Sequence, residues 1–137
     1  MPLVLITGCS SGIGRALADA FKQAGYEVWA TARKTADVAQ LRADGFVAVQ
    51  LDVNDSLEID RLSARLKQHG KGLDVLINNA GYGAMGPLLD GGVADLHMQF
   101  QTNVFSVVGT NIKGLLTTTS LLLPRLIAHG RGRRIRT

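Results

Sequence analysis

The order of apolar patterns along the chain most constrains its fold. Short runs of apolar and β-branched residues alternate with segments whose apolar residues recur every three or four positions, which is typical of strands followed by helices. The four runs expected to be strands are Leu3–Ile6, Glu27–Ala32, Phe46–Leu51 and Val75–Ile77. Strands that alternate with helices form a parallel sheet with right-handed crossovers. The sequence therefore predicts an α/β fold, a doubly wound parallel sheet of about four strands with flanking helices.

Four helical segments are expected around this sheet. The first carries an apolar stripe from Ile13 to Ala24, and the second covers Thr35–Ala43. Asp55 and Glu58 have the spacing of a capping box, which predicts the start of a third helix. A longer helical pattern runs from about Val93 to Ile127. A chain of 137 residues has room for one domain at most, so no second domain is expected.

The turn after the first expected strand is rich in glycine. Gly8 permits a sharp exit from the strand, while Gly12 and Gly14 let the backbone approach a pyrophosphate and let the helix pack on the sheet. Amides at a helix N-terminus attract negative charge. Glycine turns also occur without a ligand, but the place of this one between strand and helix favours a Rossmann-type dinucleotide site. The residues expected to contact the cofactor are Gly8, Ser10, Ser11, Gly12, Ile13 and Gly14.

The end of the second expected strand indicates which dinucleotide binds. NAD sites usually carry an Asp or Glu there, about twenty residues beyond the glycines, to hold the ribose hydroxyls. This chain has Arg33 followed by Lys34, and the nearest acid is Asp37 in the next helix. A guanidinium suits a 2′-phosphate. The alternative is an ordinary exposed arginine. The pattern favours NADP(H) over NAD(H), with residues 1–137 forming a partial NAD(P)-binding Rossmann domain.

The net charge of +4 does not indicate a nucleic-acid partner. Four arginines lie in the last seven residues, and without them eleven basic residues face eleven acidic ones. No aromatic residue is interleaved with the arginines, so a charged, solvent-exposed tail is favoured over a nucleic-acid-binding patch. The four are Arg131, Arg133, Arg134 and Arg136.

Location and metal binding are constrained by a few residues. The single cysteine, Cys9, cannot form an internal disulfide, and Leu3–Thr7 is typical of a strand rather than of a signal peptide. The apolar stretch Gly114–Leu123 is too short and too rich in hydroxyls to span a bilayer. The three histidines lack the spacing of metal ligands. We therefore expect a cytoplasmic protein without a membrane span or a metal site.

Taken together, these motifs resemble the classical short-chain dehydrogenase/reductase family. The Thr7–Gly14 segment, Asp52–Val53 after the third strand and Asn78–Gly81 after the fourth have the order and spacing of that family, up to about Gly132. The resemblance implies hydride transfer between a nicotinamide and a small alcohol or carbonyl substrate. It also implies that Asp52 and Val53 lie against the adenine. A turn that closes a strand remains the alternative for Asn78–Gly81; the resemblance implies instead that the cofactor is lined by Asn79, Ala80 and Gly81.

The family's catalytic residues are mostly missing from the chain. The resemblance calls for a tyrosine acid/base, a lysine four residues later, an orienting serine and a helical asparagine. Tyr26 and Tyr82 are followed four residues later by Ala30 and Gly86, so neither tyrosine matches. We expect a chain truncated before the serine and the Tyr-x-x-x-Lys pair, and inactive alone.

Two asparagines compete for the one catalytic position that the chain retains. The segment beginning at Thr102 is echoed eight residues later, which places Asn103 and Asn111 in similar surroundings. Chance similarity within an apolar helix, a tandem duplication and a join between related sequences all remain open. Eight helical residues advance about 12 Å, so both side chains cannot reach one point. The spacing from the upstream motifs favours Asn103.

Two functions remain open from the sequence. The favoured one is an NADP(H)-dependent oxidoreductase chain that retains the cofactor-binding half. The alternative is a non-enzymatic dinucleotide-binding or regulatory module. In either case we expect self-association, through the long helix or through the sheet edge left bare next to Val75–Ile77.

Overall fold

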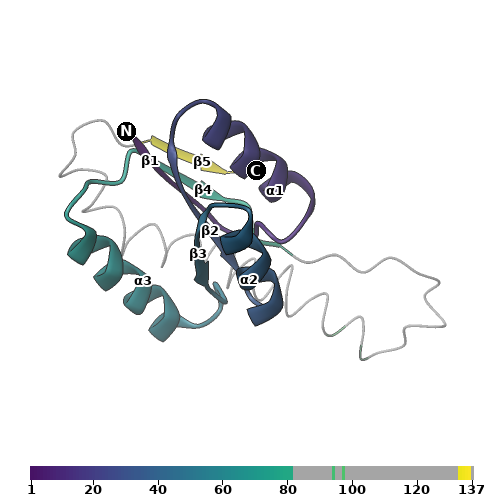
Figure 1. Cartoon of the computed structure of the whole chain (residues 1–137). Helices are drawn as coiled ribbons and strands as arrows, with labels where there is room; N and C mark the ends of the chain where they lie inside the picture. The colour runs from purple at the N-terminus through teal and green to yellow at the C-terminus, as the bar shows by residue number, and fades with distance from the viewer. Residues whose placement is uncertain (82–93, 95–96, 98–132, 137) are drawn as a thin grey trace.

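The computed structural model describes residues 1–81, 94, 97 and 133–136, which are coloured in Figure 1. Apart from residues 94 and 97, the segment from Val93 to Ile127 lies outside the described residues, and so do the expectations for Asn103 and Asn111.

A parallel sheet forms the centre of the fold (Figure 1). The strand order is β3-β2-β1-β4-β5, and every neighbouring pair is parallel. The chain builds the sheet outward from β1 in one direction and then crosses over to build it in the other, which is the order of a doubly wound Rossmann sheet. The predicted fold class is therefore confirmed. The strands are β1 (Leu3–Ile6), β2 (Glu27–Ala32), β3 (Val47–Gln50), β4 (Val75–Asn78) and β5 (Arg133–Arg136).

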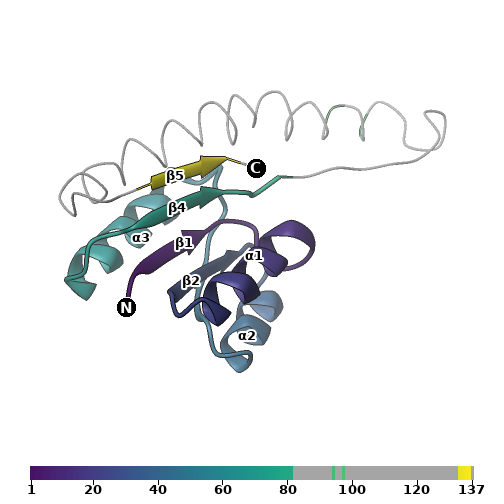
Figure 2. The ribbon, with the colours of Figure 1, turned by 90° about the horizontal axis from the view of Figure 1, so that it is seen from above.

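The fifth strand corrects two expectations drawn from the sequence. Arg133–Arg136 pairs in parallel with Val75–Asn78, so these residues form a strand of the sheet and not a separate tail. The edge of β4, expected to be bare, is occupied by β5 (Figure 2). The strand was not predicted because three of its four residues are arginine, which gives no apolar pattern. Main-chain hydrogen bonds, and not side-chain hydropathy, define strand pairing. A bare β4 edge therefore gives no ground for self-association.

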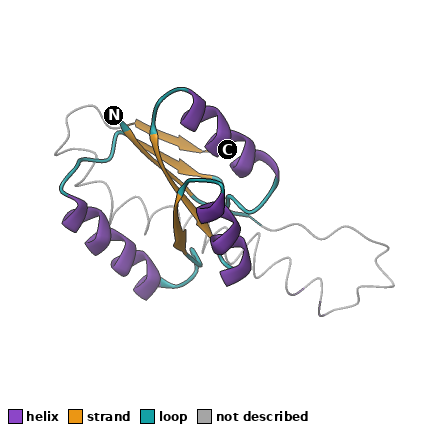
Figure 3. Cartoon of the chain, viewed as in Figure 1, coloured by secondary structure: helices purple, strands orange, loops and turns teal. Residues whose placement is uncertain are grey.

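Helices cover both faces of the sheet, as Figures 2 and 3 show. One apolar core joins α1 (Gly12–Gln23) and α2 (Thr35–Ala43) to residues such as Val4 and Ile6 of β1. The other joins α3 (Ser56–His69) to the alternate residues of the strands. All four residues of β1 are buried, because successive side chains enter opposite cores.

The predicted apolar stripe of α1 is only partly used. Ala18 is fully buried, and Leu17 and Phe21 pack against the core. Ile13, expected at the start of the stripe, is 66% exposed. It lies in the first turn of α1, beyond the edge of the sheet where the glycine-rich turn enters the helix. The helix therefore packs through a narrower face than its periodicity indicates.

Candidate functional site

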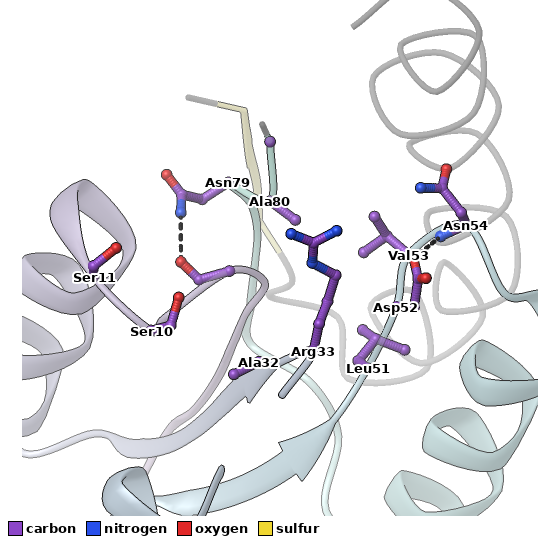
Figure 4. A pocket seen from close by; sticks show the side chains of 12 residues that line it. Ser10, Ser11, Ala32, Arg33, Leu51, Asp52, Val53, Asn54, Asn79 and Ala80 are labelled. Carbon is purple, nitrogen blue, oxygen red and sulfur yellow. Dashed lines mark hydrogen bonds between the residues drawn. The ribbon is translucent and has the colours of Figure 1, made fainter. Parts of the chain in front are cut away.

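A cleft of about 200 Å³ opens beyond the carboxyl ends of the strands (Figure 4). It is bordered by the segments that leave β1, β2, β3 and β4, so four loops far apart in the sequence meet there. This is the edge at which doubly wound sheets bind ligands. Its lining consists of Gly8, Ser10, Ser11, Ala32, Arg33, Leu51, Asp52, Val53, Asn54, Asn79, Ala80 and Gly81.

The glycine-rich turn is fixed by close packing. Gly8 has a φ of +71°, and a Cβ at that position would lie 2.8 Å from Cα of Ala80. A Cβ on Gly14 would lie 2.1 Å from the Gly8 carbonyl oxygen and 2.4 Å from Nδ2 of Asn79. On the other side, the Cys9 amide donates to the Thr31 carbonyl at 2.8 Å. Glycine is therefore needed at both positions for the turn to lie against β4 and its loop.

Thr7 and Asn79 clamp the turn to the loop after β4. The buried Thr7 hydroxyl oxygen accepts hydrogen bonds from the main-chain amides of Asn79 and Ala80, both at 3.0 Å. In return, Nδ2 of Asn79 donates to the carbonyls of Thr7, at 3.2 Å, and Gly8, at 3.0 Å. Two loops separated by about seventy residues thus share one rigid wall of the cleft.

The N-terminus of α1 is suited to an anion. Its N-cap, Ser11, makes no side-chain hydrogen bond to the helix amides, and the first turn contains no acidic residue. Neither the N-cap nor the first turn of α1 therefore neutralises the partial positive charge of these amides. Ser10 and Ser11 border the cleft beside them, with hydroxyls that can donate to a phosphate oxygen (Figure 4).

Arg33 contributes a unit positive charge to the cleft. It directly follows β2, is exposed, and extends between Ala80 and the Asp52–Val53 segment in Figure 4. Within the described part of the chain, its guanidinium forms no ion pair. A charged fork that borders a cleft and is not neutralised by the protein can bind a phosphate through two hydrogen bonds.

The loop after β3 forms the wall next to Arg33. Asp52 Oδ1 accepts from the Asn54 amide at 2.9 Å, and the carboxylate of Glu58 accepts from the Asp52 amide. Asp55 caps α3 by accepting from the amides of Leu57 and Glu58. The expected capping box is therefore only half formed, because the Glu58 carboxylate accepts from the Asp52 amide and not from the amide of the N-cap, Asp55. Val53 packs partly against the core that includes α3 and also borders the cleft.

Most of the predicted cofactor residues come together at this cleft. Gly8, Ser10, Ser11, Arg33, Asp52, Val53, Asn79, Ala80 and Gly81 all line it. Gly12, Ile13 and Gly14 do not, since Gly12 and Ile13 are exposed in the first turn of α1 and Gly14 is buried. Ala32, Leu51 and Asn54 also line the cleft, although they were not predicted from the sequence. Each lies next to a predicted residue at or just after a strand end, and that position could have identified them.

Cys9 is not placed for nucleophilic chemistry. Its thiol is buried, and burial raises its pKa to about 11 despite opposing effects of the Thr31 hydrogen bond and the Arg15 charge. The described residues contain no group of His, Cys, Asp and Glu able to hold a metal ion. None of the helices described is both long and apolar enough to cross a membrane.

Comparison with known proteins identifies what this arrangement is similar to. The family model described as short chain dehydrogenase matches residues 2–137. An uncharacterized oxidoreductase of Escherichia coli, YbbO, is 37% identical over 98% of this chain and 47% of its own length. An NADP-dependent 3-hydroxy acid dehydrogenase of Salmonella typhi, YdfG, is 30% identical over 95% of this chain and 51% of its own. The chain thus spans about half the length of these curated relatives.

A solved structure gives the same result. The structure of a short-chain dehydrogenase from Streptomyces avermitilis superposes with a TM-score of 0.75 at 35% sequence identity. The superposition covers 98% of this chain and 48% of that one.

Proposed function

The chain belongs to the short-chain dehydrogenase family, and we propose that its cleft binds the adenosine and pyrophosphate part of NADP(H) in preference to NAD(H). The pyrophosphate lies at the N-terminus of α1, where no acidic residue competes for the amides. The adenine packs against Val53 and the Asp52 loop. When bound, the cofactor supplies a hydride donor or acceptor for a small alcohol or carbonyl substrate.

The observation that carries the preference is the unneutralised charge of Arg33. This residue borders the cleft with no ion-pair partner among the described residues, at the strand end where an acid would hold ribose hydroxyls. Among the described residues that line the cleft, the one other charged side chain is that of Asp52, whose Oδ1 accepts from the Asn54 amide. A 2′-phosphate therefore meets an available guanidinium, which favours NADP(H). The relative YdfG, named as an NADP-dependent 3-hydroxy acid dehydrogenase, agrees with this preference.

Calorimetric titration with NADPH and NADH tests the proposal. We expect tighter binding of NADPH to the unaltered chain. Arg33→Asp should reverse the order, with a change in the affinity ratio of about 10- to 100-fold for loss of a charge-assisted contact. Lys34→Asp is the matched control, because it places the same charge one residue further on, outside the cleft lining. Equal affinities in the unaltered chain contradict the proposal.

We further propose that these 137 residues bind the cofactor without completing the reaction alone. The sequence contains no Tyr-x-x-x-Lys pair, since neither Tyr26 nor Tyr82 is followed by lysine at the fourth position. General acid/base help is typically worth 10²–10⁴-fold in rate, and these residues contain no such pair to supply it. Asn103 remains the predicted relay asparagine. Reduction of a ketone panel by NADPH should not exceed a heat-inactivated control, and measurable turnover would contradict this.

A cytoplasmic location and self-association complete the proposal. The one cysteine, Cys9, is free and buried, which agrees with a reducing compartment. Self-association through the segment from Val93 to Ile127 is tested by sedimentation over a concentration series. A mass that stays monomeric throughout contradicts it.

A further inference from the structure

The end of the β2–β3 ladder has an unusual side-chain contact. The last main-chain hydrogen bond between the two strands runs from the Leu51 amide to the Ala32 carbonyl, at 2.9 Å. One residue further on, Nε2 of Gln50 donates to the Arg33 carbonyl at 2.9 Å. The Gln50 side chain thus links the end of β3 to the first residue after β2.

We propose that Gln50 is a positioning residue for cofactor selection, acting through the main chain of Arg33. This inference rests on the proposed preference for NADP(H). Arg33 is exposed and its guanidinium has no ion pair within the described residues, so in that part of the chain its position depends on the backbone from which the side chain extends. Holding the Arg33 carbonyl keeps the guanidinium over the cleft and lowers the cost of ordering it when a 2′-phosphate binds.

The segment that carries Arg33 has few other restraints. It joins β2 to α2, whose N-cap, Lys34, makes no side-chain capping bond. The Lys34 carbonyl accepts from Val38 inside the helix, and Ala32 belongs to the ladder. Arg33 lies between these two points, and the bond from Gln50 is the one that holds its carbonyl. Because the bond is exposed, its loss should shift the segment without unfolding the sheet.

Glu58 offers a useful contrast on the neighbouring loop. Its carboxylate accepts from the Asp52 amide and so braces the loop proposed to contact the adenine. Adenine is common to NADPH and NADH, whereas the 2′-phosphate belongs to NADPH alone. Removing the Glu58 brace should therefore weaken both cofactors, and removing the Gln50 contact should weaken only NADPH. The two braces make separable predictions for one cleft.

The experiment compares dissociation constants for NADPH and NADH in four forms of the full 137-residue chain. Gln50→Met keeps the length of the side chain and removes the donor. Gln40→Met is the matched control, because Gln40 makes an exposed bond of 3.0 Å to Asp44 away from the cleft. The other two of these forms are the unaltered chain and Glu58→Met, and the effect of Gln50→Met is measured again in an Arg33→Ala background.

We expect Gln50→Met to weaken NADPH about 3- to 10-fold, as for loss of one hydrogen bond, with NADH unchanged. Gln40→Met should leave both constants unchanged, and Glu58→Met, which removes the acceptor for the Asp52 amide, should weaken both. In an Arg33→Ala background, Gln50→Met should have no further effect on NADPH, because the group it positions is gone. A persistent effect in that background, or equal weakening of both cofactors by Gln50→Met, overturns the inference.

Failure of the proposed function gives a different result. It is seen in the unaltered chain, as equal binding of NADPH and NADH, and the inference about Gln50 falls with it. A preference for NADPH in the unaltered chain that Gln50→Met leaves intact overturns the inference about Gln50 while the proposed function stands.

Discussion

At the amino-terminal end of the sheet, Glu27 pairs with other polar side chains, whereas at the carboxyl end Thr7 and Asn79 hold main-chain groups beside a cleft. Glu27 at the start of β2 accepts from Trp29 at 3.1 Å and pairs with His69 at 2.9 Å and Lys71 at 3.0 Å. At the other end, Thr7 and Asn79 bond to backbone, while Arg33 has no ion pair in the described part of the chain.

This difference separates stability from binding. Charges that are paired within the protein are less available to a ligand. The ion pairs of Glu27 with His69 and Lys71 therefore hold elements of the fold together. At the carboxyl end, the backbone is held from within, and the charge of Arg33 and the amides of α1 face outward. Changes at the two ends should therefore have different effects on folding and on cofactor affinity.

The largest effect is expected from Gly14→Ala. The added Cβ would lie 2.1 Å from the Gly8 carbonyl oxygen, which is main chain and cannot rotate away. We expect a loss of about 3 kcal/mol in the free energy of unfolding, measured by urea denaturation, together with loss of cofactor binding. Gly81→Ala is the matched control, because its Cβ would meet only the Asn79 carbonyl oxygen, at 3.9 Å. Equal losses of unfolding free energy in the two variants would contradict the requirement for glycine at position 14.

A smaller effect is expected from Thr7→Val. The substitution keeps the shape of the side chain but removes the acceptor for the amides of Asn79 and Ala80. Loss of the hydroxyl that these partly buried amides donate to should cost about 2 kcal/mol in unfolding free energy and weaken both cofactors. Thr7→Ser retains the hydroxyl and should preserve cofactor affinity. A valine variant that binds both cofactors as the unaltered chain does would show that the clamp does not shape the cleft.

The smallest effect on stability is expected from Glu27→Gln. Burial opposes ionisation of Glu27, but hydrogen bonds from Trp29 and Lys71 and the charges of His69 and Lys71 outweigh it, so the pKa of Glu27 is lowered. The ionised carboxylate therefore stabilises the fold above its ordinary pKa of about 4.5, and this contribution is lost as pH falls through the lowered value.

At neutral pH the loss should be about 1 kcal/mol, because Lys71 is half exposed and screened. Urea denaturation at a series of pH values below 4.5 should therefore show a smaller acid-dependent loss of unfolding free energy for the variant than for the unaltered chain. Cofactor affinity should not change, and a change would break the separation between the two ends of the sheet.

The regular elements were predictable because hydropathy determines them. The expected bounds of β2 and α2 match the structure, since each is flanked by charged residues or glycine that end the apolar pattern. The cleft was largely predictable for a related reason. Parallel strands bring their carboxyl ends to one edge, so residues that follow each strand, such as Arg33 and Asp52, meet there.

The features that were missed depend on main-chain geometry. The strand Arg133–Arg136 is recognised by its pairing with β4, which no pattern of arginines indicates. Likewise, Glu58 bonds to Asp52 and Gln50 bonds to Arg33 across strand ends. Such side-chain contacts to backbone depend on the register between β2 and β3, and the sequence alone does not fix that register.

The central claim is that Arg33 makes this cleft selective for a 2′-phosphate. Titrating the chain with 2′,5′-ADP and with 5′-AMP tests it most directly, because the two ligands differ only in that phosphate and need no nicotinamide site. We expect 2′,5′-ADP to bind about 10-fold more tightly or better, and Arg33→Ala to remove the difference. Equal affinity of the unaltered chain for the two ligands, or a preference that survives Arg33→Ala, would contradict the account.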